Sequence, residues 1–246
     1  MILPALNEEE ALPLVLAELP GGILDRVVVV DNGSTDRTPD VAREAGATVL
    51  FEARRGYGRA CLTGLDELYA DGFQGGDLIC FLDADHSDYP EDLHAVLKPL
   101  LEQRCELVIG SRVAGGATMD ALLPQAWFGN RLACFLMRAL FGARYSDLGP
   151  FRAIRTDALQ HLRMQDEDFG WTVEMQLKAK VCDLRVVEVP VRYRARIGES
   201  KITGTIRGTL SAGFKILGWI FGWRLALWFT RRRGIPRFPR ASRSER

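Results

Sequence analysis

The sequence predicts an α/β protein with a mostly parallel central sheet flanked by helices, and three observations support that class. Short apolar runs rich in β-branched residues alternate with amphipathic stretches of helical length. Two of these runs, at 26–30 and 78–82, lead directly into acidic residues, which places the acids at the carboxyl ends of buried strands. Strand, helix and strand at this spacing form right-handed βαβ units. The acids should therefore gather at one edge of the sheet, where open α/β sheets bind ligands.

The elements follow one another in the order expected of βαβ units. Apolar and β-branched runs predict strands at residues 2–3, 26–30, 47–51, 78–82, 106–110 and 186–191. Apolar stripes and helix-stop residues predict helices at residues 38–45, 60–69, 91–103, 125–141 and 170–179. A further helix should begin after Asn7, because Asn7 and Glu10 have the spacing of a capping box. Between the last two helices, the segment 146–154 is expected to contain a Gly-Pro turn.

The length and composition fit one main domain with a C-terminal appendage. The chain has 246 residues, of which 47% are apolar and 26% charged, so it can bury a sizeable core. We expect a domain over residues 1–207, an apolar and aromatic segment over 208–230, and a basic, flexible tail over 231–246. The tail carries seven arginines and one glutamate, so the rest of the chain has a net charge of −6.

Cysteine usage and the start of the chain indicate the cytoplasm. Five cysteines are dispersed through apolar runs without a CxxC pair, which is typical of reduced core thiols. Met1 leads into a short strand and the acidic stretch 7–10, so no signal peptide is expected. The charge of the tail leaves three interpretations, which are a nucleic acid partner, an anionic membrane surface, or a solvated end without a partner.

The pair Asp83 and Asp85 is the strongest indication of chemistry in the chain. Both carboxylates follow the buried strand at 78–82, and Tyr89-Pro90 favours a turn that would let both side chains reach one ion. Carboxylate oxygens suit Mg²⁺ or Mn²⁺, and such ions usually complete their coordination with substrate phosphates. The pattern therefore predicts a site for a phosphorylated substrate. The alternative is that the two acids only end the strand and cap the next helix.

Basic residues are expected at the same edge of the sheet. Arg54 and Arg55 precede the stretch 56–58, where small residues would let the backbone approach a ligand and the bases could meet a diphosphate. The stretch lacks the spacing of a Walker loop. Arg112 follows the strand at 106–110, so it could contact a phosphate near the acids. A surface salt bridge to one of those acids is an equally simple interpretation.

Five motifs, taken together and in order, resemble family 2 glycosyltransferases. They lie at residues 4–8, 30–36, 81–85, 110–112 and 198–201. The chain looks like the polyprenyl-phosphate (dolichol-phosphate) mannosyl- and glucosyltransferase branch of that family from residue 2 to about residue 208. The resemblance implies a GT-A fold, a GDP- or UDP-hexose as donor, Mg²⁺ or Mn²⁺ as cofactor, and inversion of the anomeric centre.

The resemblance also assigns residues to the donor and metal sites. The residues that it places around the nucleotide sugar are Pro4, Leu6, Glu8, Asp31, Asn32, Arg55, Asp83, Ala84, Asp85, Arg112, Arg196 and Ser200. Within this set Asp31 would hold the base, whereas Asp83 and Asp85 would meet the diphosphate and the metal. The expected metal ligands are Asp83, Asp85 and Ser87. Members of the branch often carry glutamine where this chain has Ser87, so a hydroxyl or a bound water would replace that ligand.

The same resemblance suggests an acceptor that carries a phosphate. Arg112, Arg131 and the loop from Arg194 to Lys201 resemble the phosphate-binding bases of the branch. A lipid phosphate is anionic near neutral pH, so it can attack the anomeric carbon without a general base. A hydroxyl acceptor would need a carboxylate to take its proton, and Asp147 and Glu174 are the candidates. These acids could equally orient sugar hydroxyls, and Glu174 could simply cap or pair on its own helix. The expected catalytic residues are Asp85, Arg112, Arg131, Asp147, Glu174 and Lys201.

The segment 208–230 should lie on a membrane surface rather than cross the bilayer. Lys215 and Arg224 interrupt it, and its longest uncharged run, 216–223, is far below the roughly 20 residues needed to span a membrane. Aromatic residues followed by arginines are typical of a peripheral anchor. We therefore expect attachment to the inner, cytoplasmic face of a membrane and no nucleic acid partner. The alternatives are a core helix that closes the domain and a homodimer interface.

Three rival functions stay open at this point. The same fold could act on a soluble hydroxyl acceptor, such as phosphoglycerate or a saccharide, and its activity would then not need lipid. A nucleotidyltransferase would attack phosphorus and release pyrophosphate in place of a nucleoside diphosphate. A non-catalytic protein could bind a nucleotide sugar, or bind nucleic acid through the basic tail.

Overall fold

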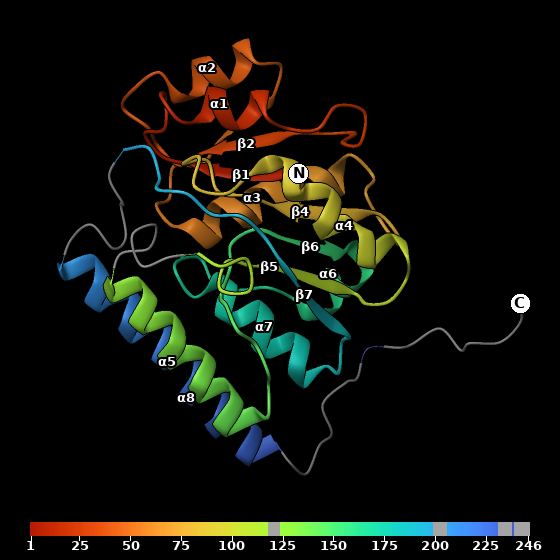
Figure 1. Cartoon of the computed structure of the whole chain (residues 1–246), viewed down its shortest axis with the longest axis vertical. Helices are drawn as coiled ribbons and strands as arrows, with labels where there is room; N and C mark the ends of the chain where they lie inside the picture. Colours follow the sequence, from red (N-terminus) through yellow and green to blue (C-terminus); the bar gives the residue numbers. More distant parts are fainter. Residues whose placement is uncertain (118–123, 199–205, 231–237, 239–246) are drawn as a thin grey trace, which may run out of the picture.

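A seven-stranded mixed sheet forms the centre of the computed structural model, which describes residues 1–117, 124–198, 206–230 and 238 (Figure 1). Its strands are β1 (Ile2–Ala5), β2 (Val28–Asp31), β3 (Thr48–Phe51), β4 (Leu78–Phe81), β5 (Leu107–Ser111), β6 (Arg152–Arg155) and β7 (Val186–Pro190). Their order across the sheet is β3-β2-β1-β4-β6-β5-β7. Every neighbouring pair is parallel except the two that involve β6. The prediction of a mostly parallel α/β sheet is confirmed.

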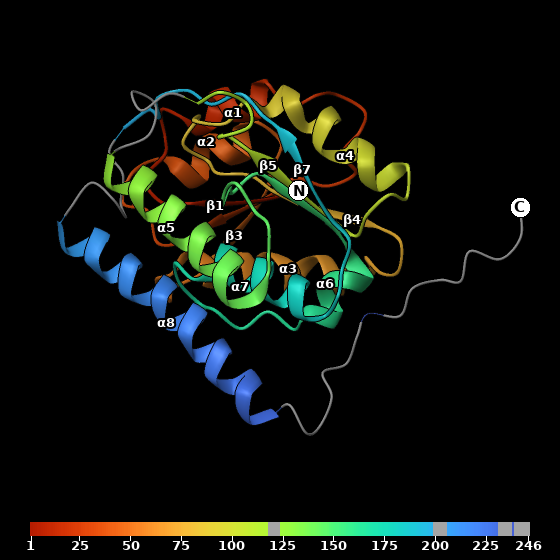
Figure 2. The ribbon, with the colours of Figure 1, turned by 60° about the horizontal axis from the view of Figure 1, so that its bottom comes forward.

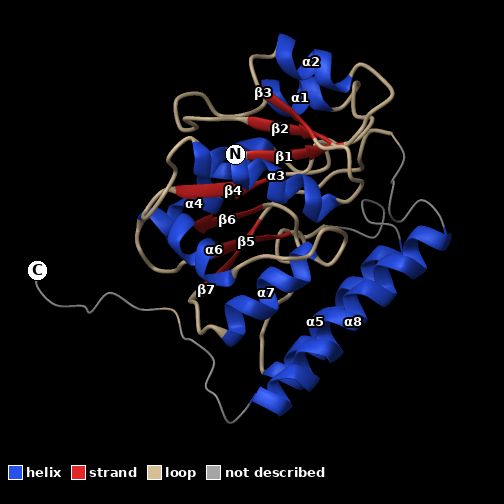
Figure 3. Ribbon diagram, turned by 180° about the vertical axis from the view of Figure 1, so that it is seen from behind, coloured by secondary structure: helices blue, strands red, loops and turns tan. Residues whose placement is uncertain are grey.

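Helices cover both faces of this sheet (Figure 3). They are α1 (Leu12–Ala17), α2 (Thr38–Glu44), α3 (Tyr57–Ala70), α4 (Leu93–Leu101, after the 3₁₀ turn Pro90–Asp92), α5 (Pro124–Phe141), α6 (Thr156–Leu162), α7 (Trp171–Val181) and α8 (Ile206–Thr230). Buried side chains of α3, α6 and α7 pack on one face of the sheet, and those of α1, α2 and α4 pack on the other. Because both faces are covered, the central strands are apolar on both sides.

Helices α5 and α8 lie side by side at the edge of the molecule, next to α7 (Figures 1 and 2). An apolar cluster that includes Met137, Val173 and Ile220 joins the three helices. Side chains of α8 are described over residues 213–225, and among these Phe214 and Phe221 are exposed. In the described parts of the chain, no helix combines the length and the hydropathy needed to cross a membrane.

Two elements were not expected from the sequence, namely β6 and α6. The segment 146–154 was predicted to be a break with a Gly-Pro turn, but after that turn β6 enters the sheet antiparallel between β4 and β5. Its sequence, Arg-Ala-Ile-Arg, is too short and too charged to resemble a buried strand. The side chain of Arg152 is nevertheless fully buried, because it donates hydrogen bonds to the carbonyls of Leu148, Gly149 and Thr172.

The predicted capping box at Asn7 is wrong. Helix α1 begins only at Leu12, and Asn7 adopts a left-handed backbone with φ of 54°. Its side-chain oxygen accepts a hydrogen bond of 2.8 Å from the backbone N–H of Thr35, and its own N–H donates to the Ser34 hydroxyl at 2.9 Å. Asn7 therefore ties the loop after β1 to the loop after β2.

The basic tail contains one described residue, Phe238. Its ring is buried in the core beside His161, with 5.5 Å between the ring centroids, and its N–H donates to the carbonyl of Cys182 at 2.9 Å. The rest of the predicted tail, 231–246, lies outside the described residues.

Candidate active site

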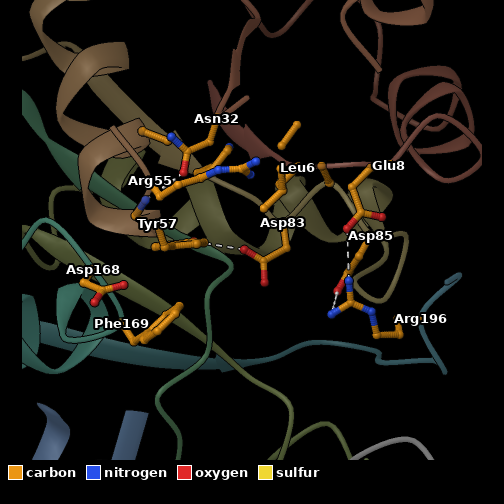
Figure 4. Close-up of a pocket in the computed structure, with 15 residues that line it drawn as sticks. Leu6, Glu8, Asn32, Arg55, Tyr57, Asp83, Asp85, Asp168, Phe169 and Arg196 are labelled. Carbon is orange, nitrogen blue, oxygen red and sulfur yellow. Dashed lines mark hydrogen bonds and ion pairs between the residues drawn. The ribbon is translucent and has the colours of Figure 1, made fainter. Parts of the chain in front are cut away.

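A cavity of about 380 Å³ opens where β1, β2 and β4 end (Figure 4), and we call it the polar cavity because several charged side chains line it. Its walls come from the loops after these strands, the start of α3, and two segments later in the chain. The predicted donor-site residues that line it are Pro4, Leu6, Glu8, Asn32, Arg55, Asp83, Ala84, Asp85 and Arg196. The fold therefore brings most of that predicted set together at the carboxyl edge of the sheet, where parallel sheets bind ligands.

Asp83 lines the cavity next to the start of α3. The Tyr57 hydroxyl donates a hydrogen bond of 2.9 Å to its Oδ1. Burial and then the nearby charge of Asp85 raise the pKa of Asp83 to about 7, while the Tyr57 hydrogen bond lowers it. The Asp83 carboxylate is thus held in place, but its ionised form is unfavourable in these surroundings. A cation beside it would stabilise that ionised form.

Asp85 is 7% exposed, and its two oxygens have different partners. Oδ1 accepts hydrogen bonds from the Ser87 hydroxyl at 2.6 Å and the Ser87 N–H at 3.0 Å. Oδ2 lies 3.2 Å from the guanidinium of Arg196. Ser87 is fully buried and faces Asp85, so in this structure its hydroxyl orients the carboxylate that was predicted as its co-ligand.

The surroundings of the acid pair fit a divalent cation. Asp88, three residues beyond Asp85, is buried, and neither of its carboxylate oxygens has a hydrogen-bond partner among the described residues. Burial and the charge of Asp83 raise the pKa of Asp88 well above its usual range. The described residues contain no preformed group of three His, Cys, Asp or Glu ligands. Two carboxylates with water and substrate oxygens would instead be the mode that Mg²⁺ prefers.

Residues after β2 shape the opposite wall. The Asn32 amide donates to the carbonyls of Glu52 and Arg54 at 3.0 and 2.7 Å and accepts from the Gly56 N–H at 2.8 Å. Asn32 therefore fixes the loop that carries Arg55, which lines the cavity. Asp31, predicted to hold the base, is 4% exposed, accepts from the Ser34 N–H at 2.9 Å and does not line the cavity.

The small residues of the 56–58 stretch also serve a purpose that was not predicted. A Cβ on Gly56 or Gly58 would lie 2.0 Å from the carbonyl oxygens of Glu167 and Asp166, respectively. These glycines thus let the chain's own 166–168 segment approach, and the Arg59 N–H donates to the Glu167 carbonyl at 2.8 Å. The close contact brings Asp168 and Phe169 into the cavity wall. Sequence reasoning missed both residues, because only this long-range packing places them there.

A second cavity, of about 530 Å³, adjoins the first and is mainly apolar. Tyr57, Asp83 and Phe169 line both cavities. The remaining walls come from α5, the segment 148–150, the start of α7 and α8. Its apolar lining includes Phe128, Leu132, Leu148, Pro150, Trp171, Phe214, Ile216 and Leu217. A polar chamber and an apolar chamber therefore meet at Asp83.

Arg112 lines the apolar cavity and is held by Asp147. The guanidinium donates to both oxygens of that carboxylate, at 2.7 and 2.8 Å, and lies 5.1 Å from the ring centre of Tyr193. Burial raises the pKa of Asp147, but the hydrogen bonds and charge of Arg112 outweigh it and leave that pKa below its usual range. Arg112 does form a salt bridge, as the simpler interpretation held, but with Asp147 rather than with the acid pair. Asp147, held in this way, is a poor proton acceptor.

Two other predicted catalytic residues line neither cavity. Glu174 is fully buried, lies 2.6 Å from the Lys178 ammonium one helical turn away, and accepts N–H bonds from Gln165 and Asp166. Pairing on its own helix is therefore the interpretation of Glu174 that the geometry supports. Arg131 is exposed on α5 and stacks on Trp127, 4.6 Å from the ring centre. The remaining predicted residues, Ser200 and Lys201, lie outside the described part of the chain.

Comparisons with known proteins agree with this geometry. Residues 1–163 match the model of the family described as glycosyl transferase family 2. An uncharacterized glycosyltransferase of Mycobacterium tuberculosis is 36% identical over 218 residues, which cover 86% of this chain and 93% of that protein. The undecaprenyl-phosphate mannosyltransferase of Micrococcus luteus is 32% identical over 227 residues, covering 84% and 88%. Among solved structures, glucosyl-3-phosphoglycerate synthase from M. tuberculosis with Mn²⁺, UDP and phosphoglyceric acid superposes with a TM-score of 0.70 at 22% identity, covering 91% and 77%.

The mixed sheet, with its acid pair at the end of a central strand, defines a GT-A nucleotide-sugar transferase fold. The chain belongs to glycosyl transferase family 2 and is a glycosyltransferase. The fold, the family and the enzyme class predicted from the motifs are confirmed.

Proposed function

We propose that this enzyme transfers a hexose from a nucleotide-diphosphate sugar to a polyprenyl phosphate, with inversion of the anomeric centre. The observation that carries the proposal is the apolar cavity, which meets the polar cavity at Asp83 and has Arg112 in its wall. A similar protein of M. luteus is named an undecaprenyl-phosphate mannosyltransferase, which supports this acceptor. The fold neighbour solved with phosphoglyceric acid supports the rival class of soluble acceptors.

The donor, a GDP- or UDP-hexose, would occupy the polar cavity. Its diphosphate would lie beside Asp83 and Asp85, which would hold Mg²⁺ or Mn²⁺ together with substrate oxygens. Bound there, the ion would neutralise the charge that develops on the leaving diphosphate. Arg55 and Arg196 line the same cavity and would add positive charge around the phosphates. The sugar would then point toward the seam with the apolar cavity.

The acceptor phosphate would enter from the apolar side. One of its oxygens would attack the anomeric carbon while the bond from that carbon to the diphosphate breaks, and a nucleoside diphosphate would leave. No proton has to be removed from the attacking oxygen, because a phosphate monoester is anionic near neutral pH. Arg112 is positioned by Asp147 to orient the incoming phosphate.

The carboxylates near the reaction centre favour a phosphate acceptor over a hydroxyl. Asp147 is neutralised by Arg112 and Glu174 by Lys178, so neither is free to take a proton. Asp168, whose pKa is raised by burial, lines the polar cavity and is the carboxylate best placed to serve a hydroxyl acceptor. The soluble-acceptor alternative therefore depends on Asp168, which gives it a separate test.

A membrane surface is the expected source of the acceptor. Phe128 and Phe135 on α5 are 63% and 64% exposed, and Phe214 on α8 is 75% exposed. Arg131 and Arg138 are exposed on α5, the helix that carries Phe128 and Phe135. Apolar side chains interleaved with arginines bind anionic lipid surfaces. We propose peripheral attachment through this face to the inner side of the membrane.

The test is transfer of radiolabelled hexose from GDP- and UDP-sugars into an organic-extractable product, with short polyprenyl phosphates and with Mg²⁺ or Mn²⁺. The proposal predicts metal-dependent label in the organic phase, abolished by a chelator. Donor consumption with all label in the aqueous phase would contradict the acceptor. In that case Asp168→Asn should abolish the aqueous product. If label instead enters the organic phase, Asp168→Asn should lower that transfer by less than about tenfold.

A further inference from the structure

The segment after β7 runs along the loop that carries the acid pair. The Arg194 N–H donates to the Ser87 carbonyl at 2.9 Å, and the Ile197 N–H donates to the Asp85 carbonyl at 3.0 Å. An isolated antiparallel bridge joins Tyr193 to Asp88. These backbone contacts hold the described segment 193–197 against residues 85–88. A rearrangement of residues 85–88 would therefore also move the segment 193–197.

The two arginines of this segment differ in how they are held. Arg194 is engaged on several sides, by the Glu18 carboxylate, by the His86 carbonyl at 2.7 Å and by the Tyr89 ring. Arg196 reaches into the polar cavity and bridges two carboxylates, with 3.2 Å to Asp85 and 3.0 Å to Glu8 (Figure 4). The buried Nε of Arg196 has no hydrogen-bond partner among the described residues. Arg194 is thus a structural anchor, whereas Arg196 retains an unused donor at the edge of the cavity.

Arg196 and a divalent cation would compete for the same oxygen. Asp85 Oδ1 already accepts two hydrogen bonds from Ser87, so Oδ2 is the oxygen open to a cation. The Arg196 guanidinium lies on that oxygen. Two positive groups at one carboxylate oxygen repel each other, so a bound ion would weaken the Arg196–Asp85 contact.

We propose that Arg196 is a displaceable counter-cation of the metal site, which couples metal binding to donor binding. In the absence of a divalent ion, Arg196 neutralises Asp85 and Glu8. When an ion takes Asp85 Oδ2, the guanidinium turns to the diphosphate of the donor and uses the Nε that lacks a partner among the described residues. Metal alone then binds weakly, because it must displace Arg196, and metal with nucleoside diphosphate binds cooperatively. This inference rests on the proposed metal-dependent use of a nucleotide sugar.

The experiment measures Mn²⁺ binding to the intact protein by the EPR signal of free Mn²⁺, without nucleotide and with saturating UDP or GDP. Arg196→Ala should tighten Mn²⁺ binding without nucleotide about fivefold, the equivalent of losing one partly exposed ion pair. The same variant should lose part of the enhancement that the nucleotide gives to the wild-type protein, and keep the part that comes from direct contact between the ion and the diphosphate. Arg196→Lys keeps the charge and should preserve the weak binding of Mn²⁺ alone.

Arg192→Ala is the matched control, because Arg192 follows β7 in the same part of the chain but pairs with Glu91 and Asp92 away from both cavities. It should bind Mn²⁺ as the wild type does. If Mn²⁺ binds the wild type but Arg196→Ala binds Mn²⁺ alone equally or less tightly, and its thermal melt shows that it is folded, the inference is overturned and the proposed function stands. If the wild type binds no Mn²⁺ even with nucleotide, both fall.

Discussion

The two cavities that meet at Asp83 are built in different ways. The polar cavity is fixed by side-chain hydrogen bonds, such as those from Tyr57 to Asp83 and from Ser87 to Asp85. The apolar cavity lies between helices, and two of its side chains, Phe128 and Phe214, remain 63% and 75% exposed. The polar groups of the first cavity are held in place, as sugar-transfer chemistry requires. The apolar cavity between helices would instead decide which acceptor binds. Substitutions on the two sides should therefore have separable effects.

The largest effect is expected from Asp85→Asn, which keeps the shape of the side chain and its hydrogen bond from Ser87 but removes a charge from the polar cavity. Because Asp85 would help to hold the ion that neutralises the leaving diphosphate, loss of its charge should lower kcat about 10²–10³-fold. Asp40→Asn is the control, since Asp40 pairs with Arg43 on the exposed surface of α2. Steady-state transfer assays check this, and a loss of less than about tenfold would remove Asp85 from the chemistry.

The next effect concerns stability at the wall of the apolar cavity. Arg112→Ala leaves Asp147 buried without its partner, which should lower the free energy of unfolding by about 3–5 kcal/mol. Arg43→Ala removes an exposed pair with Asp40 and should cost less than about 1 kcal/mol. Urea denaturation measures both.

The double variant Arg112→Ala, Asp147→Ala sharpens this test. It should regain part of the lost stability, because it leaves no unpaired buried carboxylate. It should not regain lipid-phosphate transfer, because no guanidinium then orients the acceptor. Equal stability of the single and double variants would show that the buried carboxylate is not the source of the loss.

A smaller effect, confined to the acceptor, is expected from Phe214→Ala. Phe214 lines the apolar cavity, and loss of its contact with a prenyl chain should raise the KM for polyprenyl phosphate about tenfold. The KM for the nucleotide sugar should stay unchanged. Phe135→Ala removes a ring that is 64% exposed and lines neither cavity, so it controls for general loss of aromatic surface. If Phe214→Ala raised both KM values equally, the two cavities would not bind donor and acceptor separately.

The smallest effect tests how the polar side is fixed. The Thr63 hydroxyl, followed by the Arg54 N–H and Arg59, lowers the pKa of Glu52 from 4.5 to about 2 despite burial. Because the folded pKa lies below the unfolded one, ionised Glu52 stabilises the protein above about pH 4.5, and this stabilisation is lost as the pH falls toward 2.

Glu52→Gln should therefore lower the Tm at pH 7 and flatten its dependence on pH between about 4.5 and 2. Glu44→Gln, at a side chain that is 67% exposed, should change neither. Thermal melts across this pH range check the expectation. Parallel pH curves for the wild type and Glu52→Gln would mean that the Glu52 contacts do not hold the 52–56 loop.

Much of the fold was predictable because local patterns and long-range structure agree. Apolar runs predicted the parallel strands. Gly46, with φ of 84°, follows the end of α2, as expected. The loops at the strand ends carry motif residues that face one cavity, so Glu8, Asp83 and Asp85 were found together. Strand β6 was missed because Arg152 carries a charge, and its burial depends on carbonyls that only the folded chain supplies.

Residues whose role depends on a distant partner were the ones that sequence reasoning misplaced. The 56–58 glycines were assigned to a ligand, and their second task, making room for residues 166–168 more than 100 positions away, was missed. Asp147 was a candidate base, and its cationic partner Arg112, 35 positions earlier, becomes evident only in three dimensions. Glu174 pairs with Lys178 on its own helix, which was the alternative that the sequence offered. The apolar cavity itself has no local signature, because α5 and α8 are far apart in sequence and lie together only in the fold.

The most direct test of the account is a competition between two acceptors in one reaction. The enzyme, its labelled nucleotide sugar and Mn²⁺ are mixed with equal concentrations of a short polyprenyl phosphate and 3-phosphoglycerate, and the products are separated by organic extraction. We predict that nearly all transferred label enters the lipid phase and that Phe214→Ala lowers that fraction. Label found mainly in glycosylated phosphoglycerate, unaffected by Phe214→Ala, would contradict the assignment of the apolar cavity to the acceptor.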